Sequence, residues 1–355
     1  MWFIIISILL LFASILPNIP LTHWLYSFFE FGKIQILILQ IITLASSFLL
    51  IGEINIWIRI LQLLTFISIL THIAILYKYT SFYKSIKKDR CDLSSEMITV
   101  LSANVFQENK QYETFITLIN KYDPDIFLTM ESDKNWEKAL SVFDEKYKYN
   151  IKVGLSNTYG MHLYSKLKIS AHNIHYFVAD DLPSIEAKIE TEDNYKFTFF
   201  AIHPPPPSPT EEENSKERDG ELLSIAKKIK LNSDTCVVLG DFNNVAWAKS
   251  SVLFRKTSET IDGRIGRGFI SSFHTKYWFL RFPIDLMFHT SDIFIDELKS
   301  LEDFGSDHFP IYTKFFINKK TSEQQHLTEN LEEEEHKIVQ EIITKGINEK
   351  SDNRN

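Results

Sequence analysis

Cysteine is nearly absent from this chain of 355 residues, which contains only Cys91 and Cys236. The two lie in different regions and lack metal-ligand spacing, so neither a disulfide framework nor a cysteine-ligated zinc site organises the fold. No internal repeat is visible either. The chain must therefore be stabilised by an ordinary apolar core, and its length is sufficient to bury one.

An excess of basic residues is also missing. Lys and Arg number 38 against 46 for Asp and Glu, and the formal net charge is -8. This balance argues against broad, non-specific binding of nucleic acid, because phosphate contacts usually need a basic face. Part of the acidic excess lies in the tail, which has nine acidic and four basic residues from Thr321 onward. A local basic groove is still compatible with the remainder, so nucleic acid is a disfavoured partner but not an excluded one.

Long apolar runs are abundant at the N-terminus, at residues 2–16, 34–51 and 54–77. A membrane-spanning helix needs roughly 20 mainly apolar residues, which the third run provides, the second nearly provides, and the first reaches only with residues 17–19 at the interface. All three lack the polar face of a globular helix. We therefore expect about three transmembrane helices in residues 1–77. The alternative for the first run, a cleaved signal peptide, lacks a basic segment after Met1 and a clear cleavage pattern.

The orientation of the chain across the membrane is predicted from the basic residues that follow the third run. These are Lys78, Lys84, Lys87, Lys88 and Arg90, whereas the turn between the second and third runs offers Glu53. Because basic loops tend to stay in the cytoplasm, we predict a multi-pass protein of the cell membrane whose large domain is cytoplasmic. Residues 78–96 are interpreted as a basic juxtamembrane linker that is able to contact anionic membrane lipids.

From Met97 the pattern changes to short β-type runs separated by helices and turns. Strands are expected at residues 98–104, 126–130, around 164, 197–202, 235–239, 284–288 and 311–316, and helices at 111–122 and 213–230. This mixed order suggests a layered α/β sandwich over residues 97–318. The tail, residues 319–355, is acidic and poor in aromatic residues, and is expected to be disordered or a solvated helix.

Residues able to do chemistry cluster where these expected strands end or begin. They are Asn104, Glu131, His203, Asp241, Asn243, Asp307 and His308. Strand ends are where a layered α/β scaffold brings polar groups together at one open site. Taken singly, an Asp and an Asn after Gly240 are usually turn formers. Neighbours on a strand point to opposite faces, so Asp307 and His308 cannot form a hydrolase triad with Ser306.

Five motifs in order give a more specific indication. They are LSANV at 101–105, DPDIFLTME at 123–131, GDFN at 240–243, PID at 283–285 and GSDH at 305–308. In order and spacing the chain resembles the endonuclease/exonuclease/phosphatase superfamily over residues 97–316. The string HPPPPSP at 203–209 with the later pair Arg218 and Asp219 resembles the membrane-anchored bacterial branch. The resemblance implies a two-sheet β-sandwich flanked by helices, a four-layer α/β sandwich, preceded here by about three transmembrane helices.

The resemblance also implies a set of roles. The metal, Mg²⁺ or Mn²⁺, would be held by Asn104, Glu131 and Asp307, whose oxygen donors suit a hard cation. The implied catalytic residues are His203, Asp241, Asn243, Asp285 and His308. In this scheme Asp241 orients or deprotonates the attacking water and Asn243 donates to a phosphate oxygen. His203 and His308 flank the phosphate, and Asp285 orients His308.

Three departures from the superfamily pattern concern substrate positioning more than metal binding. Met130 stands where Gln is frequent, Leu286 where His is frequent, and Lys166 where Arg is frequent.

The function predicted is a membrane-anchored, metal-dependent hydrolase that cleaves phosphate esters by attack of water at phosphorus. The tether makes a lipid-linked ester one option for the substrate. One alternative is a nuclease acting on DNA or RNA, for which Arg264, Arg267, Trp278 and Arg281 offer sparse groove material. An alternative from another class is a catalytically silent, membrane-bound interaction module. No feature of the sequence predicts an oligomeric state.

Overall fold

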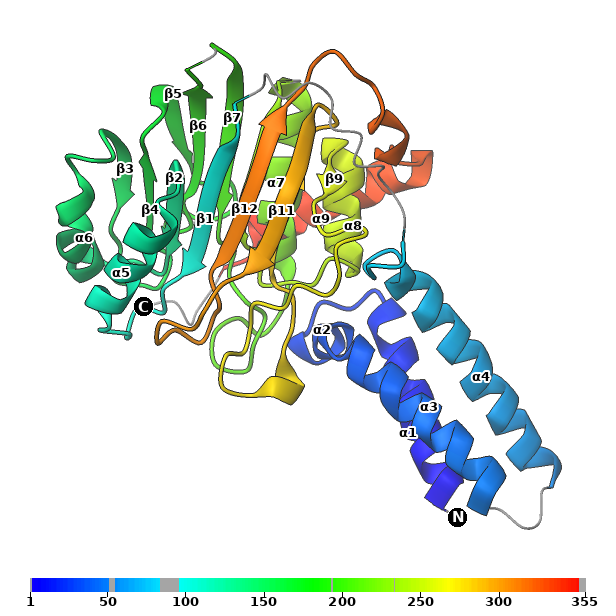
Figure 1. Ribbon diagram of the computed structural model, residues 1–355. Helices are drawn as coiled ribbons and strands as arrows, with labels where there is room; N and C mark the ends of the chain where they lie inside the picture. The colour runs from blue at the N-terminus through cyan, green and yellow to red at the C-terminus, as the bar shows by residue number, and fades with distance from the viewer. Residues whose placement is uncertain (1, 51–54, 84–95, 193, 233, 351–355) are drawn as a thin grey trace.

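A computed structural model of the chain describes residues 2–50, 55–83, 96–192, 194–232 and 234–350. Most of the basic flank expected after the third apolar run, residues 84–90, lies outside these ranges, as do Glu53 and Cys91. The chain forms two parts (Figure 1). A group of N-terminal helices projects from one end of a β-sandwich that carries helices on both outer faces.

The N-terminal helices are α1 (Trp2–Ile15), α2 (Trp24–Phe31), α3 (Lys33–Leu50) and α4 (Ile56–Tyr77). α1, α3 and α4 pack side by side. Their polar side chains turn inward: Gln40 Nε2 donates to Ser14 Oγ and to Ser68 Oγ at 2.9 Å, and the outer surfaces are lined with exposed apolar side chains. This arrangement is the inverse of a soluble helix bundle, whose polar residues face water.

One helix of the described residues, α4, is long and apolar enough to cross a membrane. α2 and α3 pass the same test together as a pair bent by 66°, and the helical stretch Trp2–Asn18 is apolar but shorter. The prediction of three transmembrane helices is therefore not confirmed, and one or two spans are what the helix lengths support.

The first sheet has six strands in the order β11-β12-β1-β2-β4-β3. Their bounds are β1 (Ile98–Asn104), β2 (Ile126–Met130), β3 (Tyr149–Val153), β4 (Met161–Ser165), β11 (Ile293–Ser300) and β12 (Ile311–Ile317). β1 pairs parallel with β2 and antiparallel with β12, so the sheet is mixed. Helices α5 (Tyr112–Tyr122) and α6 (Lys134–Leu140) cover its outer face.

The second sheet also has six strands, in the order β5-β6-β7-β8-β10-β9. Their bounds are β5 (Lys168–His175), β6 (Ser184–Glu190), β7 (Lys196–Ile202), β8 (Cys236–Asp241), β9 (Ile261–Asp262) and β10 (Asp285–His289). Helices α7 (Lys216–Asn232), α8 (Lys249–Ser258) and α9 (Glu333–Asn348) lie on its outer side. Short 3-10 turns occur at Leu16–Asn18, Ser141–Phe143, Trp278–Leu280 and Gln325–Leu327.

Three apolar clusters hold the layers together. One lies between the two sheets, where Val100, Leu128 and Phe199 are completely buried, and each of the other two packs a sheet against its helices. The predicted layered sandwich of two sheets flanked by helices is therefore confirmed. Leu76 and Tyr79, at the end of α4, belong to the cluster around α7 and α8, so the N-terminal helices are packed onto the sandwich.

The helices on the outer faces follow the apolar spacing of the sequence. In α5, Phe115, Leu118 and Ile119 are buried at helical spacing, and Asp123 ends the helix in a left-handed conformation. α6 begins at Asp133, whose carboxylate accepts hydrogen bonds from the amides of Asn135 and Trp136. α9 lies in the acidic tail but buries Val339 and Ile343 against α7, so this part of the tail belongs to the folded domain.

The topology brings the chemistry-bearing residues to one edge. β1 and β2 are parallel, as are β7 and β8, so each pair ends at a common edge of its sheet. β10 runs antiparallel to β8 and places Asp285 directly opposite Asp241. β12 runs antiparallel to β1, so the segment just before β12 reaches the same edge. Asp307 and His308 lie in this segment. They were expected to begin the last strand, but β12 begins only at Ile311.

Candidate active site

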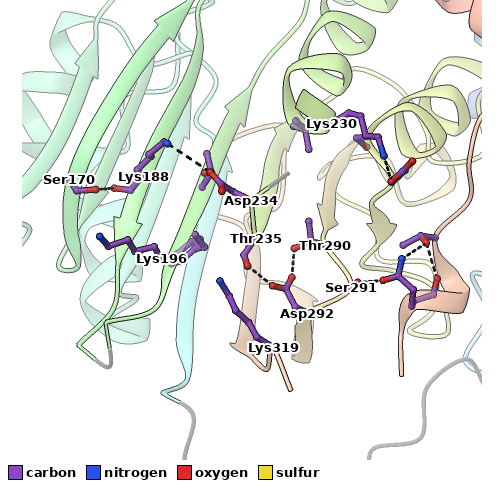
Figure 2. Close-up of a pocket in the computed structure, with 17 residues that line it drawn as sticks. Ser170, Lys188, Lys196, Lys230, Asp234, Thr235, Thr290, Ser291, Asp292 and Lys319 are labelled. Carbon is purple, nitrogen blue, oxygen red and sulfur yellow. Dashed lines mark hydrogen bonds and ion pairs between the residues drawn. The ribbon is translucent and has the colours of Figure 1, made fainter. Parts of the chain in front are cut away.

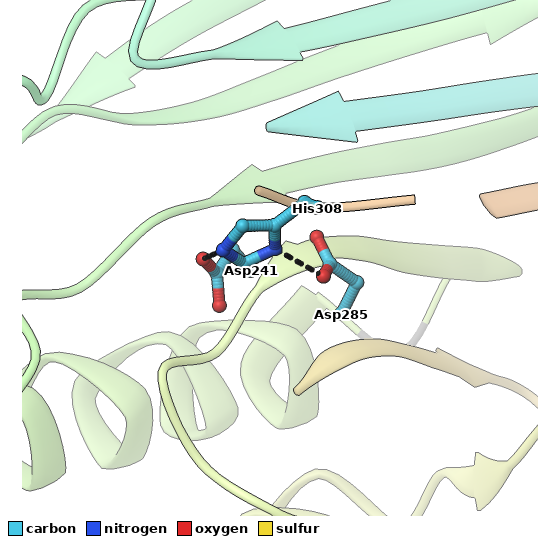
Figure 3. A group of neighbouring side chains, drawn as sticks. All are labelled: Asp241, Asp285 and His308. Atoms are coloured by element: carbon cyan, nitrogen blue, oxygen red, sulfur yellow. Dashed lines mark hydrogen bonds and ion pairs between the residues drawn. The ribbon is translucent and has the colours of Figure 1, made fainter. Parts of the chain in front are cut away.

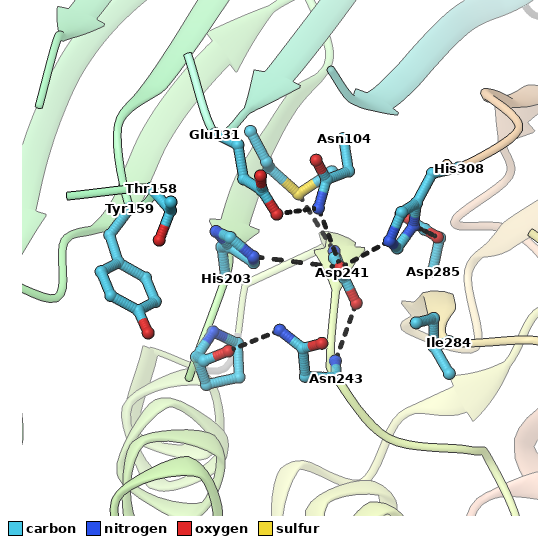
Figure 4. A network of polar contacts seen from close by, with 12 residues as sticks. Asn104, Glu131, Thr158, Tyr159, His203, Asp241, Asn243, Ile284, Asp285 and His308 are labelled. Atoms are coloured by element: carbon cyan, nitrogen blue, oxygen red, sulfur yellow. Dashed lines mark hydrogen bonds and ion pairs between the residues drawn. The ribbon is translucent and has the colours of Figure 1, made fainter. Parts of the chain in front are cut away.

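Asn104 and Glu131 form the side of the site that belongs to the first sheet (Figure 4). Asn104, at the end of β1, donates from Nδ2 to Glu131 Oε1 at 2.8 Å and to Asp241 Oδ2 at 3.1 Å. Glu131 follows β2 in a left-handed conformation with φ 57° and accepts the amide of Gln107 at 3.3 Å. The Asn104 amide thus links the two sheets through two carboxylates.

Asp241 and Asn243 are placed by the end of β8. Asp241 is 1% exposed, and its Oδ1 accepts the backbone amide of Asn243 at 2.8 Å. Asn243 has φ 48° and donates from Nδ2 to the carbonyl of Pro204 at 3.0 Å. Its own carbonyl accepts a hydrogen bond from buried Arg218 at 3.1 Å. These contacts fix the orientation of both side chains before any ligand binds.

His308 lies between two carboxylates (Figure 3). Its Nδ1 is 2.7 Å from Asp285 Oδ2, and its Nε2 is 3.5 Å from Asp241 Oδ2. All three side chains are buried. A carboxylate on each ring nitrogen stabilises the imidazolium form, because both nitrogens then act as donors.

His203 occupies the opposite side of Asp241. It follows β7, is 4% exposed, and places Nε2 3.9 Å from Asp241 Oδ2. Its Nδ1 is buried with no hydrogen-bond partner among the described residues, and its ring lies 5.6 Å from that of Tyr159. A buried ring nitrogen without a partner is costly unless a ligand or water satisfies it.

The electrostatic environment separates the two histidines. Burial, and secondarily the charge of His308, lowers the pKa of His203 to about 3, so this ring is neutral. Burial also opposes a charge on His308, but the carboxylates of Asp285 and Asp241 outweigh burial and raise the pKa of His308. One histidine is therefore neutral and the other is held as a cation.

Two carboxyl groups of the site have raised pKa values. Burial raises the pKa of Glu131 to about 7, although the hydrogen bond from Asn104 acts against this change. Burial and the neighbouring charge of Asp285 also raise the pKa of Asp241. Acidic groups crowded together in this way are stabilised in their ionised form by a bound cation.

A divalent metal ion fits this cluster. Asp241, Asp285 and His308 offer ligand atoms that all lie within 4.8 Å of one another. This group differs from the predicted metal ligands Asn104, Glu131 and Asp307. Of these, Asn104 and Glu131 are hydrogen-bonded to each other, whereas Asp307 is close enough for its charge to raise the pKa of Glu131. Both ring nitrogens of His308 face carboxylates, so the protonated ring has no lone pair to offer a cation.

Several residues of the site are not evident from the sequence. Ser306 Oγ donates to the Asn104 carbonyl at 2.8 Å and accepts the amide of His308 at 3.1 Å. Ser272 Oγ accepts the amide of Asp285 at 3.0 Å. Met130, in place of the frequent Gln, accepts the amide of Asp241 on its sulfur at 3.0 Å. These contacts join segments far apart in the chain. The sequence drew attention to Ser306 of the GSDH motif and to Met130 as a departure from the superfamily pattern, but it gave no signal for Ser272.

A separate pocket of about 800 Å³ lies at the opposite edge of the sheets (Figure 2). It contains none of the predicted site residues. Lys188 pairs with Asp234 at 3.8 Å, and Asp292 accepts hydrogen bonds from Thr235 and Thr290. Because no residue of the five motifs lines this pocket, we place the chemistry at the edge that contains Asp241.

Comparison with known protein families shows which family the chain belongs to. The model of the Endonuclease/Exonuclease/phosphatase family matches residues 101–308, a span that includes all eight predicted site residues. The chain belongs to this family. Members of the Endonuclease/Exonuclease/phosphatase family are hydrolases that act on phosphate esters.

Solved structures support the fold of this family member. A family protein from Bacteroides thetaiotaomicron is 17% identical with a TM-score of 0.54, over 65% of this chain and 99% of that chain. Human nocturnin is 14% identical with a TM-score of 0.53, over 62% and 95%. The B. thetaiotaomicron mannosyl-6-phosphatase is 18% identical with a TM-score of 0.51, over 62% and 100%. No curated protein sequence matched. The shared part is the sandwich, and the fold is what these likenesses establish.

Proposed function

We propose that the protein is a membrane-anchored phosphoesterase that uses a divalent metal ion to hydrolyse phosphate esters. The observation that carries this proposal is the hydrogen-bonded set at one sheet edge, in which His308 bridges Asp285 and Asp241 while Asn104 bridges Asp241 and Glu131. Three carboxyl groups and one amide surround this point together with a charged imidazole. The oxygen atoms suit a metal ion, and the imidazolium suits the anionic phosphoryl group that the ion accompanies.

Mg²⁺ or Mn²⁺ is the proposed cofactor, held by Asn104 and Glu131 with Asp307 nearby. When bound, the ion supplies charge stabilisation at the phosphoryl oxygens. The carboxylate of Glu131 and the amide oxygen of Asn104, which accepts the amide of Phe106 at 3.0 Å, are hard donors of the kind these cations prefer. The raised pKa of Glu131 supports this role, because a cation replaces the proton that the buried carboxyl otherwise binds near neutral pH.

Asp241 is the residue best placed to orient the attacking water. It is fixed by hydrogen bonds from Asn104 and from the Asn243 amide, and it faces both histidines. His308, kept protonated by Asp285, is placed to donate to a phosphate oxygen and stabilise charge in the transition state. Neutral His203 offers a further ring N–H on the other side of Asp241. No covalent intermediate is needed.

Membrane anchoring is supported by α4 and by the inverted polarity of the helices around it. Hydrogen bonds also fasten these helices to the sandwich. Trp24 N donates to the Glu213 carbonyl, and Trp247 Nε1 donates to the Glu30 carbonyl at 2.8 Å. A bilayer around these helices would hold the catalytic edge at a defined height above its surface.

The test is a phosphoester panel with full-length protein in detergent, assayed with and without Mn²⁺ or Mg²⁺. It spans lipid headgroup esters, sugar phosphates and DNA. We expect metal-dependent hydrolysis that His308→Ala reduces by about 10²-fold or more. His172→Ala is the matched control, because His172 is exposed on β5. Absence of hydrolysis on every substrate would favour the silent interaction module.

The nuclease alternative receives less support from the structure. Arg264 is 3% exposed and pairs with Asp262, and Arg267 donates to the carbonyls of Gly263 and Ile295. Neither guanidinium is available to a nucleic acid backbone, so only two of the four residues proposed for a nucleic-acid groove can contact a nucleic acid. Plasmid nicking that is abolished by Asp241→Ala would support the nuclease alternative.

A further inference from the structure

An exposed apolar tip stands out on the loop between β9 and β10. It consists of Tyr277, Trp278, Phe279 and Leu280, here called the aromatic tip, with exposed fractions of 50%, 78%, 53% and 39%. Four consecutive exposed apolar side chains are unusual on a soluble surface and mark a site that contacts something apolar. Lys276 and Arg281 flank the tip on either side.

The aromatic tip is attached to the N-terminal helices. Gln35 Nε2, in the first turn of α3, donates to the carbonyl of Phe279 at 3.0 Å. Close by, the rings of Phe31 and Phe282 meet edge to face at 5.8 Å. The tip thus lies where the bent pair α2 and α3 turns, next to the sandwich (Figure 1). If α3 and α4 enter a bilayer, this point is at the level of the headgroups.

The same loop is attached to the catalytic residues at its base. The ring of Phe273 lies 4.9 Å from that of His308, and the two residues form a backbone bridge. Thr275 donates from its amide to the Asp307 carbonyl at 2.9 Å and from Oγ1 to the Ser306 carbonyl at 2.8 Å. Only two residues separate Thr275 from Trp278, so the loop runs directly from the site to the aromatic tip.

Exposed apolar side chains also occur on α2, which contacts the same loop through Phe31 and Phe282. Leu25 and Phe28 of α2 are 41% and 56% exposed. Trp and Tyr prefer the membrane interface, and Lys and Arg beside them meet lipid phosphates. The segment 276–281 combines both kinds of residue, because Tyr277 and Trp278 lie between Lys276 and Arg281. A bilayer is therefore the occupant that fits the tip, in preference to a partner protein or stacked bases.

We propose that the aromatic tip is seated in the bilayer interface beside the catalytic centre, and that the substrate is an amphiphilic phosphate ester. The apolar part of this substrate stays in the bilayer while its phosphate reaches His308 and Asp241. This inference rests on the proposed phosphoesterase function for the identity of the substrate. The position of the tip in the membrane rests on the proposed membrane anchoring and not on the phosphoesterase activity.

The position is tested first, without reference to activity. Full-length protein with Cys91→Ser and Trp278→Cys is labelled with an environment-sensitive fluorophore and reconstituted in vesicles of phosphatidylcholine and phosphatidylglycerol. Cys236 is buried, so it is shielded from the label. We expect quenching by brominated lipids and protection from aqueous iodide. The control is Leu231→Cys, which is 81% exposed at the end of α7, away from the site edge, and which iodide should quench. Quenching of the residue 278 label by iodide alone would overturn the proposal.

The substrate class is tested by comparing a lipid with its deacylated, water-soluble counterpart. Two such pairs are phosphatidic acid with glycerol 3-phosphate, and phosphatidylglycerol with glycerophosphoglycerol. In Trp278→Ser/Phe279→Ser we expect the ratio of lipid to soluble hydrolysis to fall about tenfold, and in Leu231→Ser to stay unchanged. An unchanged ratio in the double variant, with or without lower rates on both substrates, would contradict the proposal. If the unaltered protein cleaves neither member of either pair but is active elsewhere on the panel, the amphiphile is rejected. If it is inactive on every ester, the phosphoesterase proposal fails instead.

Discussion

The two histidines of the site differ in protonation because they face different neighbours. His308 has a carboxylate on each ring nitrogen, whereas His203 is buried across Asp241 from the cationic His308, and its Nδ1 has no hydrogen-bond partner among the described residues. A pair of titratable groups whose pKa values are moved apart in this way can provide two different functions at one pH. In the proposed reaction one ring donates as a cation and the other as a neutral group.

Asp285→Asn should expose the dependence of His308 on its partner. The change removes the charge that raises the pKa of His308, so the protonated ring is lost at lower pH. We expect kcat to fall about 10²- to 10⁴-fold and the basic limb of the pH–rate profile to move to lower pH. The measurement is a pH–rate profile with Asp296→Asn, an exposed residue of β11, as control. A lower rate with an unmoved basic limb would show that Asp285 has only a structural role.

Metal affinity should depend on pH through Glu131. Its pKa of about 7 means that a proton competes with the cation below neutrality, and that the competition ends above it. Titration calorimetry with Mn²⁺ should show affinity that weakens about tenfold for each pH unit below 7 and levels off above 8.

Glu131→Gln should abolish this pH dependence and weaken binding, because the variant has no carboxylate to ionise. Glu145→Gln, at an exposed carboxylate, should leave both unchanged. A pH dependence that survives in Glu131→Gln would assign the competing proton to another group.

At the scale of elements, the junction of β7 and β8 sets the geometry of the site. The register pairs Ile202 with Gly240, so the next residues, His203 and Asp241, are also neighbours. A Cβ on Gly240 would collide with the carbonyl oxygen of Ile202, and its φ of 155° is one that other residues rarely adopt. Glycine is thus required where the two strands deliver their functional side chains.

Gly240→Ala should therefore separate the two strands at this point. We expect a loss of about 2–4 kcal/mol in the free energy of unfolding, and activity reduced even in the folded fraction. Denaturant unfolding and the activity of the folded protein measure the two effects. Gly32→Ala is the control, because its φ is -77° and its Cβ would meet only Ile36 Cδ1, at 4.0 Å. Equal losses in both variants would contradict the steric argument.

At the scale of the whole molecule, the N-terminal helices and the sandwich are joined by contacts on several elements. Gly266 N donates to the Lys78 carbonyl, and Ser215 N donates to the Thr22 carbonyl. With Leu76 and Tyr79 in the domain core, the exit of α4 is fixed relative to the catalytic edge. The orientation of the helices in a membrane therefore also sets the direction in which the site faces.

The side of the membrane can be tested with C-terminal fusions to full-length protein. The basic residues after α4 predict a cytoplasmic domain, because positively charged flanks are retained on that side. We expect a green fluorescent protein fusion to fluoresce and an alkaline phosphatase fusion to be inactive, and carbonate washing should not release either. Active alkaline phosphatase would place the domain outside, and release by carbonate would argue against a span.

The sequence by itself determined the sandwich and the set of residues that are candidates for the site. Short β-type apolar runs placed β1 and β2 at their observed bounds, and helical apolar spacing placed α5 to within one residue. The five ordered motifs and the HPPPPSP string together indicated eight residues that the fold brings to one edge of the sandwich. Strands β3, β5, β6, β9 and β11 were not predicted, since they are very short, their apolar patterns are irregular or their faces are exposed.

The resemblance already predicted that Asp285 orients His308, whereas only the tertiary structure decided the other contacts among these residues. The second contact of His308, to Asp241, joins the segment before β12 to β8, and no local pattern encodes such pairing. The same holds for the burial of Arg264 and for α9, whose acidic sequence concealed a packed face. It holds also for the aromatic tip, an ordinary apolar stretch until the fold leaves it exposed between His308 and α3. Residue patterns report local periodicity, whereas proximity and solvent exposure depend on the packing of the whole chain.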